Sequence, residues 1–120
     1  MKPILLNQPL PEMMSVGSVE NLGSTVISGS PQAEVAMISG TPEDALSCGL
    51  FGCTEGEFSM QYPFTEHATV LEGEVELTNE ETGESHTYKQ GDSWFVEQGT
   101  KVRWHIRTPK FIKHYLAVAQ

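Results

Sequence analysis

Apolar and polar residues alternate with a period of two along much of the chain. Segment 101–107 places three apolar residues on one face and lysine, arginine or histidine residues on the other, and segments 57–62 and 74–78 alternate in the same way. Because successive side chains of a strand point to opposite faces, this pattern predicts half-buried β-strands. No long stretch carries the 3.6-residue apolar period of an amphipathic helix.

Short strands separated by glycine and proline residues are predicted throughout, at 22–28, 33–38, 47–53, 57–62, 67–72, 74–78, 85–89, 93–97, 101–107 and 110–118. This close spacing is typical of a sandwich or barrel, and the alternation favours a barrel with a filled or liganded interior. Residues 1–20, with three prolines, are predicted to form an irregular N-terminal arm, and residues 21–120 the barrel domain. The segment Thr41-Pro42-Glu43-Asp44 predicts about one turn of helix.

Charge narrows the classes of partner. The chain has 120 residues, enough for one domain, and a net charge of −9. We therefore expect no binding to nucleic acids or anionic membranes, which requires a basic surface. All 16 acids lie in residues 1–100, whereas residues 101–120 carry only basic charges. The basic segment either pairs with acidic strands of the same barrel, which we favour, or presents a face to an anionic ligand.

Cysteine usage and the N-terminus both indicate a cytoplasmic protein. Cys48 and Cys53 are the only cysteines, and a chain of this size does not need a disulfide, so we expect two reduced thiols. The apolar run Ile4-Leu5-Leu6 ends at Asn7 and is far too short for a signal peptide or a membrane span.

The order of features from residue 49 to 115 resembles the cupins. Glu66 stands seven residues before Gly73, Gly91-Asp92 follows a hairpin, and Gly99 follows one further strand. Within the cupins, the chain is most similar to the small single-domain proteins related to the barrel of (S)-ureidoglycine aminohydrolase and to ethanolamine-utilisation cupins. This similarity is carried by segment 49–58, Tyr62-Pro63, Glu66, Leu71-Glu72-Gly73, Gly91-Asp92, Gly99, Trp104 and Lys113-His114-Tyr115. The resemblance implies an all-β, double-stranded β-helix of the jelly-roll class, with the N-terminal arm outside it.

The metal ligands of catalytic cupins are largely missing. The resemblance implies two histidines and a glutamate from the first motif and one histidine from the second. Counting back from Glu66, the histidine positions hold Ser59 and Gln61 in one spacing, or Met60 and Tyr62 in the other. In the second motif Val102 stands at the histidine position. One carboxylate does not make a transition-metal site, so we expect no cofactor, although a divalent metal remains an alternative.

The four histidines of the chain offer few alternatives. His67 adjoins Glu66, so on a strand their side chains point to opposite faces, and we expect His67 at the surface or at an interface. We expect His86 to be exposed on a hairpin strand. His105 and His114 lie on the last two predicted strands, and a site that combines one of them with Glu66 stays open.

The resemblance places five polar or aromatic residues around the barrel mouth: Tyr62, Glu66, Trp104, Lys113 and Tyr115. Glu66 would act as general acid or base and Lys113 would neutralise a carboxylate, as the candidate catalytic pair. Tyr62, Trp104 and Tyr115 are the candidate ligand-binding residues. Alternatively, Glu66 and Lys113 form a structural ion pair inside the barrel, Trp104 belongs to the core and Tyr115 to the sheet.

Two classes of function follow. The first is a cupin that binds a small polar metabolite in its barrel, with a role in nitrogen-compound or ureide metabolism implied by the resemblance. Whether such a protein is an enzyme stays open; no G-x-S-x-G nucleophile motif and no glycine-rich phosphate loop occurs. The second is a non-catalytic sensor or accessory cupin that acts as a homodimer, with the Ile4-Leu5-Leu6 segment exchanged across the interface.

Overall fold

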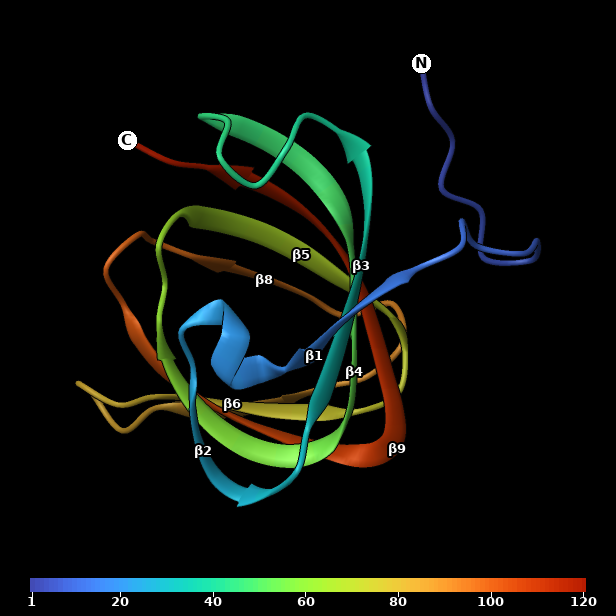
Figure 1. Cartoon of the computed structure of the whole chain (residues 1–120). Helices are drawn as coiled ribbons and strands as arrows, with labels where there is room; N and C mark the ends of the chain where they lie inside the picture. The colour runs from blue at the N-terminus through green and yellow to red at the C-terminus, as the bar shows by residue number, and fades with distance from the viewer.

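The chain forms an antiparallel β-barrel, described here over residues 1–120 by a computed structural model (Figure 1). Its elements are β1 (Met14–Ser18), the 3-10 helix η1 (Val19–Leu22), β2 (Thr25–Gly29), β3 (Gln32–Ser39), β4 (Leu46–Gln61), β5 (Thr65–Glu72), β6 (Val75–Asn79), β7 (Ser85–Tyr88), β8 (Ser93–Val96) and β9 (Lys101–Val118). The predicted all-β class is confirmed. No helix has the length and apolar character that a membrane span requires.

Two long strands organise the barrel. β4 and β9 pair along nearly their whole length, and the sheet continues in the order β1-β3-β4-β9-β5-β8. β2 pairs with the second half of β4, while the β6–β7 hairpin attaches to the first half of β9. β7 pairs only with β6, and β8 pairs only with β5. These two strand edges therefore face each other across an open seam of the barrel.

Two pairs of predicted strands are continuous in the structure, which corrects the prediction of four separate strands at 47–53, 57–62, 101–107 and 110–118. Each pair of segments is a single strand that bends at a bulge, where the β4–β9 register shifts between Thr54 and Gly56. Gly56 allows Pro31 to approach, because a Cβ atom there would lie 2.7 Å from the proline Cδ. Alternation predicted which residues face inward, but a bulge lets the hydrogen-bonded ladder continue through a bend.

The N-terminal arm is more ordered than predicted. Residues 14–18 form β1, which pairs with β3, and the 3-10 helix η1 follows before β2 begins at Thr25. Ser18 caps η1, and Val19 is buried in the main core at 1% exposure. Figure 1 shows β1 and η1 lying across the front of the barrel. Apolar packing of Val19 against the barrel interior therefore orders a segment whose local sequence predicts none.

Apolar residues pack in two clusters on opposite faces of the sheet. The main cluster fills the barrel and contains Phe58, Trp104 and Phe111. The smaller cluster, Leu50, Leu71 and Ile112, lies on the outer face and is covered by arm and β3 side chains, namely Ile4, Leu10, Met13, Ala36 and Ile38. Lys2 Nζ also donates a hydrogen bond to the Ile38 carbonyl at 2.7 Å. The arm therefore packs against its own barrel.

The helical turn predicted at Thr41 is a reverse turn. The Asp44 backbone N–H donates to the Thr41 carbonyl at 3.0 Å, and Asp44 Oδ2 accepts from the Thr41 N–H at 2.8 Å. β4 begins at Leu46, only two residues later, so the chain joins the sheet before a helix can form.

Candidate functional site

Glu66 is the centre of a hydrogen-bonded group inside the barrel. It lies on β5, opposite Val96 of β8 and Ala117 of β9, and is 1% exposed. Its Oε1 atom accepts hydrogen bonds from the Tyr62 hydroxyl at 2.9 Å and from Trp94 Nε1 at 3.0 Å. Its Oε2 atom accepts from Lys113 Nζ at 2.6 Å. Both carboxylate oxygens are therefore paired with donors, as a buried charge requires.

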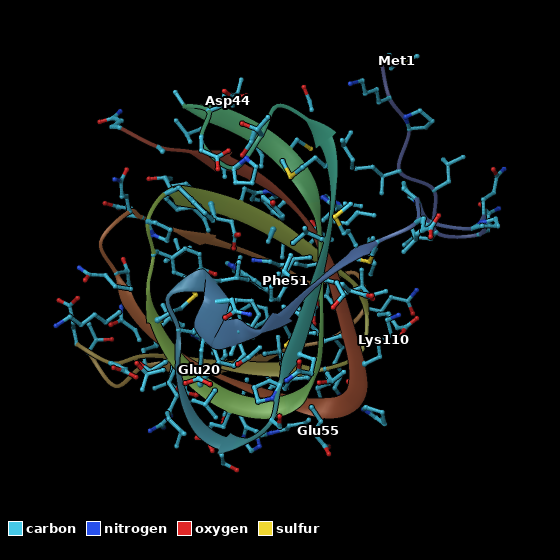
Figure 2. The ribbon with its side chains drawn as sticks, viewed as in Figure 1. Met1, Glu20, Asp44, Phe51, Glu55 and Lys110 are labelled. Atoms are coloured by element: carbon cyan, nitrogen blue, oxygen red, sulfur yellow. The ribbon has the colours of Figure 1, made fainter.

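Lys113 sits among aromatic rings. It is 4% exposed, and its Nζ atom lies 4.9 to 6.0 Å from the centroids of five rings, those of Trp104, Phe51, Tyr115, Trp94 and Tyr62. Ring faces attract cations, and this attraction is strongest where water is excluded. Figure 2 shows Phe51 near the middle of the barrel, whereas Lys110 and Glu55 lie at its periphery.

Burial perturbs the acid–base properties of this group. It lowers the pKa of Lys113 from its ordinary 10.5, while the charge of Glu66 and its hydrogen bond oppose this shift. Burial, followed by the charge of Glu66 and its hydrogen bond, raises the pKa of Tyr62 well above 10.0. Burial and the charge of Glu66 likewise raise the pKa of Tyr115. Both phenols therefore remain protonated near neutral pH, and Tyr62 is a permanent donor to Glu66.

The residues at the cupin ligand positions do not fit a divalent metal. Met60, near the end of β4, packs against the main core, and Tyr62, just after β4, is buried and bonded to Glu66. Val102 is buried in the core. No group of three or more histidine, cysteine or acidic side chains is arranged to hold a metal ion. Beside Glu66 stands the ammonium group of Lys113, whose positive charge would repel a metal cation.

A small cleft opens next to this group, at the seam between the β6–β7 hairpin and β8. Its volume is about 140 Å³, and it is lined by Tyr62, Leu77, Asn79, Glu84, His86, Tyr88, Trp94, Phe95, Val96, Thr100 and Val102. Tyr62 and Trp94 both line the cleft and both donate to Glu66. The buried ion pair therefore fixes two side chains that a bound molecule in the cleft would contact.

The predicted site residues divide between the cleft and the core. Tyr62 lines the cleft, whereas Glu66 and Lys113 lie directly behind it. Trp104 is a core residue, stacked on Phe58 at 5.5 Å, and its Nε1 atom has no hydrogen-bond partner in the protein. Tyr115 points inward from β9 and donates to the Met37 sulfur at 3.7 Å. The structure thus brings all five residues into one interior but only Tyr62 to the cleft.

Trp94 and Tyr88 are the site residues that sequence reasoning missed. Trp94 shares the inward face of β8 with Val96, so alternation after the Gly91-Asp92 turn was a signal for its burial. Its hydrogen bond to Glu66, however, spans 28 positions in the chain and depends on the β5–β8 pairing. Tyr88 contacts Trp94 edge-on, with ring centroids 5.1 Å apart, across two strands that are not hydrogen-bonded to each other.

Most of the basic C-terminal segment pairs with acidic strands, as we favoured. Arg103 approaches Glu57, Arg107 Nη2 lies 3.0 Å from Glu76, and Lys110 Nζ lies 3.0 Å from Glu34. These pairs are partly exposed and contribute little stability each. Histidine placement also follows the prediction, because His67 and His86 are exposed. His105 and His114 do not contact Glu66, whose polar partners are Tyr62, Trp94 and Lys113.

Comparison with known proteins supports this architecture. A structure of a protein of unknown function from Pseudomonas syringae pv. tomato has 26% sequence identity and a TM-score of 0.76, covering 91% of this chain and 45% of that one. This chain therefore spans less than half of that protein. The Clostridium difficile EutQ protein has 18% identity and a TM-score of 0.63, covering 75% of this chain and 70% of its own. A Salmonella typhimurium structure described as a putative ethanolamine utilization protein Q has 16% identity and a TM-score of 0.60. The match covers 93% of this chain and 98% of that one.

A search of curated proteins finds no match to this sequence. The family model of the EutQ-like cupin domain, by contrast, matches residues 40–115, which include Tyr62, Glu66, Trp94 and Lys113. The match extends over more than half of the chain and agrees with the barrel topology. The chain belongs to the EutQ-like cupin family.

Proposed function

We propose that this protein binds a small planar polar metabolite, carrying an amide or ureido group, in the cleft between the β6–β7 hairpin and β8. The observation that carries the proposal is the hydrogen-bonded floor of the cleft. Tyr62 and Trp94 line the cleft and donate to one oxygen of Glu66, whose other oxygen pairs with Lys113. The buried ion pair replaces a metal as the group that organises the site.

The energetics of the ion pair support a functional role. A buried pair of charges loses its hydration, and apolar residues of similar volume are often equally or more stabilising. Stability alone therefore does not account for Glu66 and Lys113 in the middle of an aromatic core. Buried charges that adjoin a cleft and perturb the pKa of their neighbours are typical of functional sites.

The size and lining of the cleft restrict the ligand. A volume of about 140 Å³ is well below the roughly 300–1,000 Å³ of sites for drug-sized molecules, so the ligand has few heavy atoms. Tyr88 and Trp94 provide aromatic ring surface against which a planar group can pack. Asn79, His86 and Thr100 provide hydrogen-bond donors and acceptors at the rim. This combination suits an amide or ureide better than a flexible aliphatic molecule.

Two further observations support the proposed class of ligand and the proposed cellular compartment. One structural relative is described as an ethanolamine utilization protein, which supports a ligand from nitrogen-compound metabolism. Both cysteines are free, which supports our proposal that the protein works in a reducing compartment, the cytoplasm. Within this proposal Glu66 and Lys113 are positioning residues, because neither lines the cleft. Their catalytic role stays a prediction.

A ligand panel tests the proposal directly. Thermal unfolding would be measured with ureides, primary amides, amino acids and small carboxylates, and with ethanolamine as a small nitrogen compound that lacks a planar group. We expect a ureide or amide at one hundred times its Kd to raise the Tm by about 10 °C. Ethanolamine should leave the Tm unchanged.

Matched histidine variants locate the binding site. His86 lines the cleft. His67 is also exposed, but it lies on the outer face of β5, away from the cleft. His86→Ala should abolish most of the ligand-induced shift, and His67→Ala should preserve it. A panel in which no ureide or amide shifts the Tm by more than about 1 °C would overturn the proposal. Equal responses of the two variants would do the same.

A further inference from the structure

The floor of the cleft has no free hydrogen-bond donor. Tyr62 and Trp94 each carry one polar hydrogen, on the hydroxyl and on Nε1 respectively. Tyr62 donates its hydrogen to Glu66 Oε1 at 2.9 Å, and Trp94 donates to the same atom at 3.0 Å. Both side chains are buried, so diverting either hydrogen to a ligand would leave the buried carboxylate with one donor fewer. A carbonyl oxygen of a ligand therefore finds no donor at the floor.

The rim of the cleft, by contrast, carries a carboxylate. Glu84 contacts His86 Nε2 through Oε1 at 3.1 Å, whereas its Oε2 atom makes no hydrogen bond or ion pair within the chain. Asn79 and Tyr88 also carry donors at the rim, but both are neutral. Hydrogen bonds to a charged acceptor are roughly twice as strong as those between neutral groups. A ligand that donates to Glu84 therefore gains more than one that accepts from the rim.

The negative charge of Glu84 extends into the cleft. Burial, followed by the charges of Glu84 and Asp92, raises the pKa of Tyr88 above its ordinary 10.0. Tyr88 lines the cleft and contacts Trp94 of the floor edge-on. An electrostatic potential that disfavours a phenolate on this ring favours a cation placed beside it.

Further acids line two hollows that adjoin the cleft along the seam. One hollow shares Tyr88 with the cleft and adds Asp92, and the other shares Phe95 and adds Glu81 and Glu97. None of the seven lysine and arginine residues of the chain lines the cleft or either hollow. The surroundings of the cleft are therefore negative, and they should attract cations and repel anions.

Aromatic rings line the same cleft. Tyr88, Trp94 and Phe95 contribute to its surface, and Phe95 is 65% exposed. Organic cations bind to the faces of aromatic rings, and the planar guanidinium group also stacks on them. Ring surface beside a carboxylate therefore suits a cation that is planar.

We infer that the cleft prefers a cationic planar group, a guanidinium or an amidinium, over the neutral ureido or amide group of the same shape. This inference rests on the proposed function, because it assigns a charge to the ligand of the same cleft. A guanidinium group has only donors and no acceptor. It therefore matches a cleft whose floor has spent its donors on Glu66 and whose rim presents the Glu84 carboxylate. The same acids disfavour a ligand that carries a carboxylate.

The preference should be modest and sensitive to salt. The Glu84 side chain is 73% exposed, so water and dissolved ions screen its charge. Exposed charge pairs of this kind change a binding constant by up to about fivefold. We therefore expect the cation to bind about three- to fivefold more tightly than its neutral counterpart at low ionic strength. At an ionic strength of about 1 M this ratio should approach one, because the screening length falls to about 3 Å.

Two pairs of matched ligands test the inference, methylguanidinium with methylurea and acetamidinium with acetamide. Their dissociation constants would be measured at neutral pH by NMR titration of the labelled whole chain. Glu84→Gln removes the charge at the rim. Glu55→Gln removes the same charge from an exposed residue at the bulge of β4, which lines neither the cleft nor the adjoining hollows and lies at the periphery of the barrel (Figure 2). The ratio of dissociation constants should fall towards one in Glu84→Gln and stay unchanged in Glu55→Gln.

The outcomes separate this inference from the proposed function. Equal binding of each cation and its neutral counterpart overturns the inference and leaves the proposed function standing. Binding of the cations alone supports the inference and contradicts a ureide or amide as the ligand. No binding by any of the four compounds overturns both. An unchanged ratio in Glu84→Gln overturns the inference, and so does an equal fall in both variants, because the net charge of the chain would then attract the cation.

Discussion

On the inner face of β9, Lys113 is buried beside an equally buried Glu66, whereas on the outer face of the same strand Leu116 and Val118 are exposed to solvent. Leu116 follows Lys113 by only three positions in the chain. Soluble domains ordinarily place charged side chains outside and large apolar ones inside. This segment departs from that arrangement on both faces.

The two departures differ in their physical cost. Inside, each charge is balanced by a hydrogen-bonded partner, so removal of one partner would leave an uncompensated buried charge. Outside, the exposed leucine and valine residues lose little in a single chain and gain only when they are covered. The charged interior is therefore sensitive to single substitutions, whereas the exposed exterior tolerates them. Substitutions on the two faces should differ accordingly.

The largest effect is expected from Lys113→Met. This change leaves the Glu66 carboxylate buried without its cation, and should reduce the free energy of unfolding by about 3–5 kcal/mol. Denaturant unfolding measures it. The double variant Glu66→Gln/Lys113→Met removes both charges and should recover most of the loss. A single variant that loses less than about 1 kcal/mol would show that the pair is not a coupled unit.

Tyr62→Phe should have the next largest effect. The substitution keeps the ring but removes the hydroxyl that donates to Glu66 Oε1 at 2.9 Å. Hydrogen bonds to charged groups contribute about 1.5–3 kcal/mol, and the free energy of unfolding should fall by that amount. Tyr115→Phe is the matched control, because its hydroxyl donates its hydrogen bond to the uncharged Met37 sulfur, and its loss should cost less. Equal losses for the two variants would contradict the central position of Glu66.

Alkaline pH should lower the free energy of unfolding through the buried thiol of Cys53. Burial raises the pKa of Cys53 from 9.0 to about 12, so the folded thiol stays protonated while the unfolded thiol ionises. The contribution of the protonated Cys53 thiol to the free energy of unfolding is fully present below pH 9. It is lost as pH rises towards 12, by up to about 1.4 kcal/mol per pH unit. Between pH 8 and pH 10, the free energy of unfolding should decline less for Cys53→Ala than for the unaltered chain. Parallel declines of Cys53→Ala and the unaltered chain would contradict this assignment.

The smallest effect is expected at Leu46, an exposed residue on the outer face of β4. Leu46→Ala should change the unfolding free energy of the monomer by no more than about 0.5 kcal/mol, because the side chain is exposed. Leu50→Ala, on the same face and strand but under the arm, should cost about 2–5 kcal/mol. Unfolding in dilute solution compares the two. Similar losses would show that Leu46 is already covered within one chain.

Much of the fold follows from local pattern. Period-two alternation correctly predicts the inward residues of β4, β6 and β9, among them Phe58, Val75 and Trp104. It also predicts that Glu66 and His67 point to opposite faces. Alternation is a property of adjacent residues, so a single sequence carries it. The Glu66 motif and its glycines likewise sufficed to predict the cupin family that the family model shows.

The candidate site needed the tertiary structure. Lys113 lies 47 positions from Glu66 and Trp94 lies 28 away, so their hydrogen bonds exist only in the register that pairs β5 with both β9 and β8. The cleft, similarly, depends on a seam between two strands that do not pair. Register and strand order are set by packing of the whole barrel, which no local pattern records.

The sequence by itself therefore determined the class of fold, the faces of the strands and the absence of the usual histidine ligands. Tertiary structure decided what takes their place: an ammonium group among aromatic rings, a cleft floored by Tyr62 and Trp94, and an ordered segment at Val19. The physical reason is the range of the interactions. Side-chain alternation acts between neighbours, whereas ion pairs, ring contacts and burial join residues that only folding brings together.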